Sequence, residues 1–178
     1  MRERKRNRIS NFDYGRDNLY FVTSCTHNRV CCFGEIDNKR MLLNEIGEIA
    51  HRQWQWLINK YPYLKSHAFV VMPNHIHGLL EINRGIVGTG RDLSVQYGNE
   101  KRTGHDLSLP CKIKSLSQLI GAYKTTTSKQ IHLLGYDEFA WQRSFHDHVI
   151  RNTLSLEKIT EYITDNPINW DDKIFNIY

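Results

Sequence analysis

The stretch VVMPNHIHGLLEI, from Val70 to Ile82, decides how the rest of the chain is interpreted. Two histidines, His75 and His77, are separated by one isoleucine in an otherwise apolar segment that is typical of a β-strand. Successive side chains of a strand point to opposite faces, so the two imidazoles share one face while Ile76 points into the core. Such a pair predicts a divalent-metal site, and two partly exposed histidines on a polar strand face are the alternative.

The composition of the 178 residues is that of one globular domain. Its formal net charge of +5 at pH 7 favours a polyanionic partner without requiring one. No apolar run is long enough to span a membrane, and the basic segment 1–15 lacks the apolar stretch of a secretory signal. The four cysteines follow neither a disulfide framework nor a zinc-finger spacing. We therefore expect a single cytoplasmic domain over 1–178 that begins with a basic arm.

Two strands and a helix are predicted in the first half of the chain. Aromatic and β-branched residues indicate a strand over 18–26. Apolar residues that recur every three or four positions then indicate a helix over 42–57, with Asp37 or Asn38 as its N-cap. The segment around the histidine pair is a second long strand, and Pro73 inside it implies an edge, a bulge or a change of direction.

The second half begins with a segment over 83–113 that carries five glycines and no sustained period. We expect a flexible loop there. A helix follows over 115–135, with a serine cap at its start and Gly135 at its end. A strand-like segment and a last amphipathic helix before Asn166-Pro167 complete the order. This order is typical of an α+β domain in which helices pack on an antiparallel sheet.

Six blocks of the sequence resemble, in this order, the His-hydrophobic-His (HUH) single-tyrosine transposases, and above all the REP-associated tyrosine transposases and their single-strand insertion-sequence relatives. The blocks are YFVTSCTHNR, CCFGEI, VVMPNHIHGLL, LIGAYKTTTSKQI, FAWQRSFHDHVIRN and ITEYITDNPINW. Together they cover most of the chain outside the basic arm and the glycine-rich loop. The resemblance implies a ferredoxin-like antiparallel sheet of the HUH endonuclease type, with helices packed mainly on one face and the histidine strand at its centre.

The resemblance also implies a DNA transposase that cuts and rejoins single-stranded DNA at hairpins. A divalent metal, Mg²⁺ or Mn²⁺, would be held by His75 and His77. A tyrosine would attack a phosphodiester to give a 5′-phosphotyrosine and a free 3′-hydroxyl. These roles are chemically consistent, because a metal polarises the phosphate and a phenol of pKa about 10 needs activation or favourable geometry to attack.

Tyr123, in the block GAYK, matches the family position of the nucleophile. From the pattern alone it lies on the apolar stripe of a helix, where an aromatic ring normally packs in the core. Relatives carry a polar metal ligand one turn after the tyrosine. Here that place holds Thr127, with Gln130 two turns on, and water or a substrate oxygen could complete the metal's shell instead.

Candidate DNA contacts are basic side chains that could form the wall of a groove, with scattered solvated charges as the alternative. Trp141 matches a family block and could stack on a base or pack in the core. The basic candidates are Lys124, Arg143, Lys112 and Lys114.

Two other functions remain open from the sequence. A domesticated, catalytically weak protein that binds DNA hairpins is one, because Thr127 is a weak metal ligand. A metal hydrolase that uses only the two histidines and no nucleic acid is the other.

A further pair, His146 and His148, imitates the histidine motif but is expected at the start of a helix, in a structural or DNA-facing role. The sequence decides neither the target DNA nor between a monomer and a homodimer.

Overall fold

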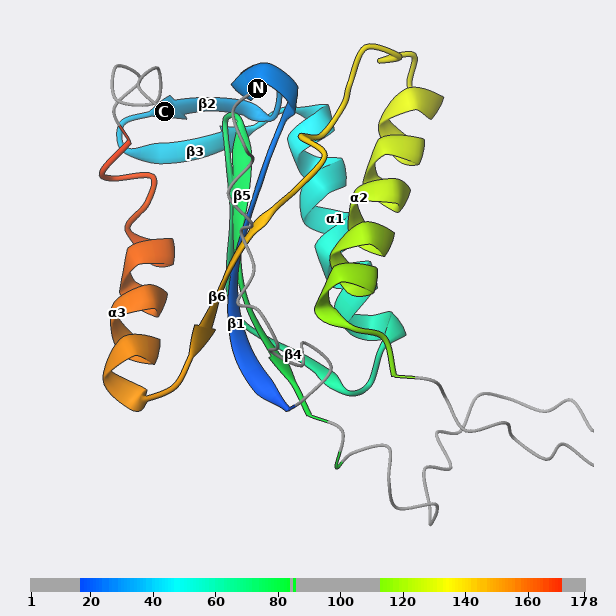
Figure 1. Ribbon diagram of the computed structural model, residues 1–178. Helices are drawn as coiled ribbons and strands as arrows, with labels where there is room; N and C mark the ends of the chain where they lie inside the picture. The colour runs from blue at the N-terminus through cyan, green and yellow to red at the C-terminus, as the bar shows by residue number, and fades with distance from the viewer. Residues whose placement is uncertain (1–16, 84, 86–112, 171–178) are drawn as a thin grey trace, which may run out of the picture.

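The computed structural model describes residues 17–83, 85 and 113–170 (Figure 1). The predicted basic arm over 1–15, nearly all of the glycine-rich segment and Lys112 lie outside the described residues. The elements run in the order β1 (Asn18–Cys25), η1 (His27–Arg29), β2 (Gly34–Asp37), β3 (Arg40–Leu43), α1 (Glu45–Lys60), β4 (Leu64–Met72), β5 (His75–Ile82), α2 (Leu116–Leu133), β6 (His146–Ile150) and α3 (Thr153–Thr164).

Four antiparallel strands form the main sheet in the order β4-β5-β1-β6, and β2 pairs with β3 in a separate hairpin. The histidine strand β5 is therefore central, as predicted. Helices α1 and α2 cover one face of the sheet, and α3 lies alone on the other (Figure 1). The α+β class is confirmed. Within the described residues, no helix has the length and apolar character needed to cross a membrane.

The long strand predicted around the histidine pair is two strands, β4 and β5, joined by a tight turn at Pro73 and Asn74. Met72 pairs with His75 across this turn. Proline has no N–H to give to a strand ladder, and a turn removes the need for one. The Pro73 carbonyl accepts hydrogen bonds from the N–H groups of Cys32 and Phe33, which fixes the turn against the preceding segment.

Helix α1 begins at Glu45, and the prediction of its cap was wrong. The side chain of Asn44 accepts the hydrogen bond from the Gly47 N–H, so Asn44 is the N-cap. Leu42 and Leu43, expected in the helix, belong to strand β3. Short strands of four residues are too brief for an apolar period to reveal them.

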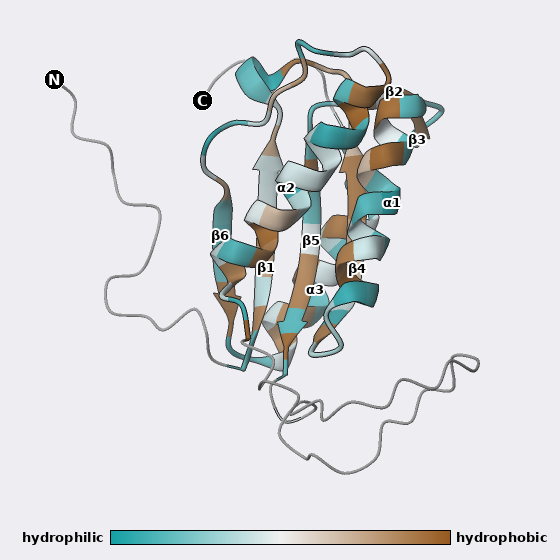
Figure 2. Ribbon diagram, turned by 90° about the vertical axis from the view of Figure 1, so that its right-hand side faces the viewer, coloured by the Kyte–Doolittle hydropathy of each residue, from teal (hydrophilic) through white to brown (hydrophobic). Residues whose placement is uncertain are grey.

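The larger core lies between the sheet and the helices α1 and α2. In Figure 2 these two helices stand in front of strands that are brown, that is, apolar, along much of their length. Trp54 of α1 is fully buried there, and its ring stacks on Phe69 with centroids 4.3 Å apart. A Cβ atom on Gly78 would lie 2.3 Å from the Trp54 ring, so only glycine fits at this point of β5.

Helix α2 matches its prediction closely. Ser115 and Gln118 form a reciprocal capping box at its start, and Gly135 follows its end with a φ of 90°. Its apolar stripe is buried against α1 and the sheet. Leu134, expected on that stripe, is 46% exposed because the helix has already ended at Leu133.

Helix α3 is held by a smaller apolar cluster on the opposite face of the sheet. Ile163 is its one buried residue, and it packs with Leu79 of β5 and Ile150 of β6. Partly buried side chains from β1, β4 and α3 itself surround these three. Leu79 lies two residues beyond His77, so α3 covers the face of β5 that carries the histidines.

Candidate active site

The two histidines of β5 form a buried pair beneath α3. His75 is 2% exposed and His77 is 5% exposed. Their ring centroids are 4.5 Å apart, and their Nε2 atoms are 3.0 Å apart. Ile76 points to the opposite face and is fully buried in the larger core. The prediction that the imidazoles share one face is confirmed.

The other ring nitrogen of each histidine has its own polar partner. His75 Nδ1 is 2.7 Å from Asn74 Oδ1, and His77 Nδ1 is 2.8 Å from Thr23 Oγ1. Asn74 Nδ2 donates to the carbonyl of Arg29, which fixes the side-chain amide so that its oxygen faces the ring. An amide oxygen only accepts, so His75 Nδ1 carries the proton and His75 Nε2 presents a lone pair. The Thr23 hydroxyl can support the same tautomer in His77 by accepting from Nδ1.

Both imidazoles are held neutral. Burial and, to a smaller extent, the positive charge of Arg29 together lower the pKa of His75 to about 4. Burial also holds the pKa of His77 well below its usual value, with the neighbouring His75 acting in the same direction. Neutral imidazole is the form that binds metals. A strongly perturbed pair of titratable groups also marks this place as a functional-site candidate.

The pair fits a divalent metal ion. Two nitrogen ligands that each lie about 2.1 Å from a metal, with a nitrogen–metal–nitrogen angle of about 90°, would be about 3.0 Å apart. This is the separation observed between the two Nε2 atoms. No cluster of three or more His, Cys, Asp or Glu side chains suited to a metal occurs in the described part of the chain. The remaining ligands would therefore be neutral oxygens from amides, hydroxyls, water or substrate.

Tyr162 of α3 is the tyrosine that the fold brings to this pair. Its hydroxyl is 3.4 Å from His77 Nε2, and the two ring centroids are 5.3 Å apart. The residue is 49% exposed, so Tyr162 lies at the boundary between the buried pair and solvent. Phe21 of β1 stacks on His77 and meets Tyr162 edge to face, which holds both rings in place.

Tyr123, which the sequence predicts as the nucleophile, lies elsewhere. Tyr123 is fully buried between α2 and α1, on the face of the sheet opposite the histidines. Its hydroxyl donates to the carbonyl of Ala50 at 3.1 Å, and its ring meets Trp54 edge to face. Burial raises the pKa of the Tyr123 phenol far above its usual value, which disfavours the phenolate.

The predicted third ligands, Thr127 and Gln130, lie on the same helix as Tyr123, α2. Thr127 is fully buried and donates to the carbonyl of Tyr123, and Gln130 is exposed on the same helix. The structure therefore does not bring either side chain to the histidines. One turn beyond Tyr162 the chain carries Asn166, which is 8% exposed.

Two of the predicted DNA contacts, Lys124 and Lys114, are engaged with other parts of the chain. Lys124 donates to the carbonyls of Gln142 and Arg143 on the α2 side of the molecule. Lys114 packs over the ring of Tyr61, with Nζ 5.9 Å from the ring centroid. Arg143 is exposed.

The second histidine pair is in strand β6 and not at a helix start. Thr23 of β1 pairs with His77 on one side and with His146 on the other. His148 lies two residues further along the same face and, like His146, is exposed. These two imidazoles therefore border the face of the sheet that carries the buried pair.

Sequence reasoning missed Tyr162, Thr23 and Asn74. All three lie inside the family blocks quoted above, but only the strand register and the placement of α3 show that they meet. One signal was available for Tyr162. It stands beside the apolar stripe of its helix, next to Ile163 and three residues after Ile159, where a side chain can reach past the core to solvent.

The sequence was compared with protein families and with known proteins. No protein-family model matches the sequence. An uncharacterized protein of Haemophilus influenzae (strain Rd) is 28% identical over 172 residues, which are 96% of this chain and 92% of that protein.

Two solved structures resemble the chain. A REP-associated tyrosine transposase bound to a REP hairpin matches with a TM-score of 0.53 and 19% identity, over 94% of this chain and 73% of that one. A putative transposase from Deinococcus radiodurans R1 matches with a TM-score of 0.44 and 14% identity, over 92% and 97% of the two chains. The first likeness shows that this chain has the fold of a REP-associated tyrosine transposase.

Proposed function

We propose that this protein is a metal-dependent DNA strand transferase of the HUH tyrosine transposase type, and that Tyr162 is its nucleophile. One observation carries the proposal. The phenol of a half-exposed tyrosine lies 3.4 Å from one of two buried, neutral imidazoles whose Nε2 atoms converge. The fold shared with a REP-associated tyrosine transposase supports the same reaction class.

His75 and His77 would hold the metal through Nε2. Asn74 and Thr23 keep the two rings in the required orientation. When bound, a divalent ion would polarise the scissile phosphate.

Tyr162 Oη would attack phosphorus and lose its proton to solvent. The bond from phosphorus to the 3′-oxygen breaks, and that oxygen takes up a proton. The product is a 5′-phosphotyrosine and a free 3′-hydroxyl. Because the phosphotyrosine conserves the phosphodiester, the reverse attack by a 3′-hydroxyl rejoins strands without ATP.

Two further residues fit supporting roles. Arg29 lies close enough to His75 for its charge to lower the pKa of that ring, so it would also attract a phosphate placed over the pair. Asn166 stands one turn beyond Tyr162, where its amide oxygen is suited to complete the shell of Mg²⁺ or Mn²⁺.

The proposed substrate is single-stranded DNA that contains a hairpin. The solved REP-associated transposase holds a REP hairpin, and the net charge of +5 favours a polyanionic ligand. A hairpin-binding protein without turnover is the second candidate. It is favoured because no cluster of three or more metal-ligating His, Cys, Asp or Glu side chains occurs in the described residues, so these residues supply few strong ligands beyond the pair.

The test is a covalent-adduct assay with hairpin oligonucleotides taken from the DNA that flanks the gene. The oligonucleotides carry a 3′-end label, because the 5′ end of the downstream fragment joins the tyrosine. With Mg²⁺ or Mn²⁺, a labelled protein–DNA band should appear on a denaturing gel. It should vanish in Tyr162→Phe, in His75→Ala and after chelation by EDTA.

Tyr123→Phe is the matched control and should retain the adduct. An adduct that survives Tyr162→Phe but is lost in a folded Tyr123→Phe protein would overturn the assignment of the nucleophile. Tight hairpin binding without any adduct would favour the binding protein instead.

A further inference from the structure

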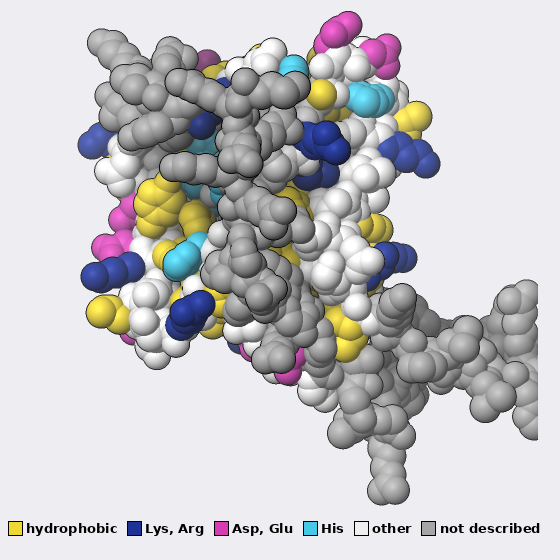
Figure 3. All heavy atoms as spheres, in the orientation of Figure 1, with side chains coloured by type: hydrophobic (Ala, Val, Ile, Leu, Met, Phe, Trp, Pro, Cys, Tyr) yellow, Lys and Arg dark blue, Asp and Glu magenta, His cyan; other side chains and the backbone are white. Residues whose placement is uncertain are grey.

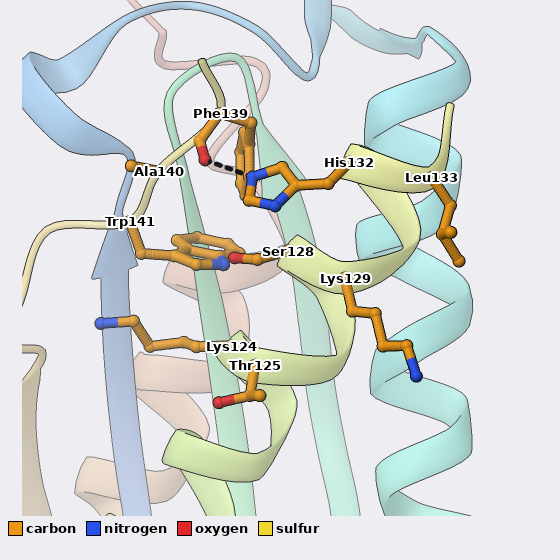
Figure 4. A pocket seen from close by; sticks show the side chains of 9 residues that line it. All are labelled: Lys124, Thr125, Ser128, Lys129, His132, Leu133, Phe139, Ala140 and Trp141. Carbon is orange, nitrogen blue, oxygen red and sulfur yellow. Dashed lines mark hydrogen bonds between the residues drawn. The ribbon is translucent and has the colours of Figure 1, made fainter. Parts of the chain in front are cut away.

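A cavity of about 680 Å³ lies between α2 and the segment 139–141, on the face of the sheet opposite the histidine pair (Figure 4). None of the residues that line it takes part in the proposed cleavage site. Phe139, Ala140 and Trp141 lie on a largely apolar wall, and α2 forms the other wall, which is polar except for Leu133. The cavity is therefore a second place on the molecule that could receive a ligand.

The polar wall is made of hydrogen-bond donors and cations. Lys124 and Lys129 contribute ammonium groups, and Thr125 and Ser128 contribute hydroxyls. Among the residues that the structure describes, no acidic side chain lines the cavity, and α2 has none along its entire length. On the side of α2, at the right of Figure 3, Lys and Arg side chains gather around uncharged polar groups, with acidic side chains at the top of that side. This electrostatic pattern suits an anion.

Trp141 supplies an independent observation at the inner end of the cavity. Its Nε1 atom is buried and has no hydrogen-bond partner. The indole ring cannot easily turn, because it packs against Phe33, Phe139 and Tyr123 at centroid distances of 5.4, 5.4 and 5.8 Å. In Figure 4 its nitrogen points toward α2, beside Ser128. A buried N–H without an acceptor is costly, and a ligand oxygen that displaces the side chain covering it would remove the cost.

Lys124 is already oriented at this wall. Its Nζ donates to the carbonyls of Gln142 and Arg143, which uses two of its three N–H groups. Partial burial lowers the pKa of this ammonium, and an anion beside it would compensate for the lost hydration. His132 is not available in the same way, because its Nε2 is 2.9 Å from the carbonyl of Phe139.

We propose that this cavity binds a phosphodiester group of the single-stranded DNA substrate, at a distance from the cleavage site. The phosphate oxygens would accept hydrogen bonds from the lysine, hydroxyl and indole donors, and the sugar or base would rest on the apolar wall. The inference rests on the proposed function. It adds a second contact on the other face of the sheet, so that a bound strand must pass around the edge of the sheet to reach both sites.

The test is the salt dependence of DNA binding, measured by fluorescence anisotropy with a labelled hairpin that has single-stranded flanks. All proteins carry Tyr162→Phe so that no adduct forms. Loss of one phosphate contact to a single strand lowers the slope of log K against log salt by about 0.7, which is about fourfold in Kd at 0.15 M salt. Lys129→Ala should show both changes. Trp141→Phe, which keeps the ring and removes the N–H, should also raise Kd.

Lys60→Ala is the matched control, because Lys60 is an exposed lysine at the end of the neighbouring helix α1, away from the cavity. If Lys129→Ala and Trp141→Phe bind DNA with the Kd and salt slope of Lys60→Ala, the inference is overturned while the proposed function stands. If the parent protein binds no hairpin at all and the wild type forms no adduct, both fail. Thermal stabilisation by inorganic phosphate alone, equal to that by DNA and lost in Lys129→Ala, would also overturn the assignment to a DNA strand.

Discussion

The substitution Thr23→Val tests whether the hydroxyl of β1 tunes the proposed metal pair. Thr23 Oγ1 lies 2.8 Å from Nδ1 of His77, which is one of the two candidate metal ligands. Valine keeps the branched shape at Cβ and the preference for a strand, and it removes only the hydroxyl. The variant should therefore fold while the orientation and tautomer of His77 become less well defined.

The expected loss is about tenfold in metal affinity. Removing an outer partner of a metal-ligating histidine typically costs ten- to a hundredfold. The lower end applies here, because His75 retains Asn74 at 2.7 Å and Phe21 still stacks on His77. Tenfold corresponds to about 1.4 kcal/mol. The buried Nδ1 left without its partner should in addition lower the free energy of unfolding by about 1 kcal/mol.

The assay follows the yield of covalent adduct as Mn²⁺ is titrated at a fixed concentration of hairpin DNA. The midpoint should move to about tenfold higher Mn²⁺ in Thr23→Val, with the same final yield. Thr127→Val is the matched control, since Thr127 is also a buried threonine with a bonded hydroxyl but lies on the opposite face of the sheet. An unchanged midpoint in Thr23→Val, or an equal shift in Thr127→Val, would refute the reasoning.

Three further substitutions probe the framework of the fold. Gly78→Ala places a Cβ 2.3 Å from the fixed Trp54 ring, so we expect urea unfolding to show a loss of about 1–3 kcal/mol; an unchanged midpoint would mean that the ring can move aside. Tyr123→Phe removes the hydrogen bond that the phenol adds to the Ala50 carbonyl, which keeps its partner inside helix α1, and should cost about 1 kcal/mol in the same measurement; an unchanged unfolding midpoint would contradict that role. Ser115→Ala removes the capping box of α2 and should lower stability by about 1 kcal/mol, whereas Ser115→Thr should restore most of it.

The histidine pair shows what sequence alone can establish. A period of two places His75 and His77 on one face of a strand, and the structure confirms it. The same period does not tell which helix covers that face. Tyr123 was expected near the pair because it matches the family position of the nucleophile, but its helix faces the sheet from the other side. The choice between two faces depends on chain topology, which local periodicity does not contain.

The partners of the pair depend on register and turn geometry. Thr23 is 54 residues from His77 in the chain and meets it only because β1 and β5 pair in one particular register. Asn74 was noted as part of a proline interruption, but its role appears only when the interruption is recognised as a hairpin turn. Both are properties of pairing between segments, so no pattern within one segment predicts them.

The isolated position of α3 has a consequence for motion. The helix buries a single residue, Ile163, whereas α1 and α2 bury six residues each. Elements with few buried apolar contacts open locally at a lower free energy than the rest of a protein. We therefore expect the amide hydrogens of α3 to exchange with solvent before those of β5. Tyr162 would then belong to a helix that can move away from the sheet while His75 and His77 stay fixed. A DNA strand attached to the Tyr162 phenol could in this way be moved from one DNA end to another.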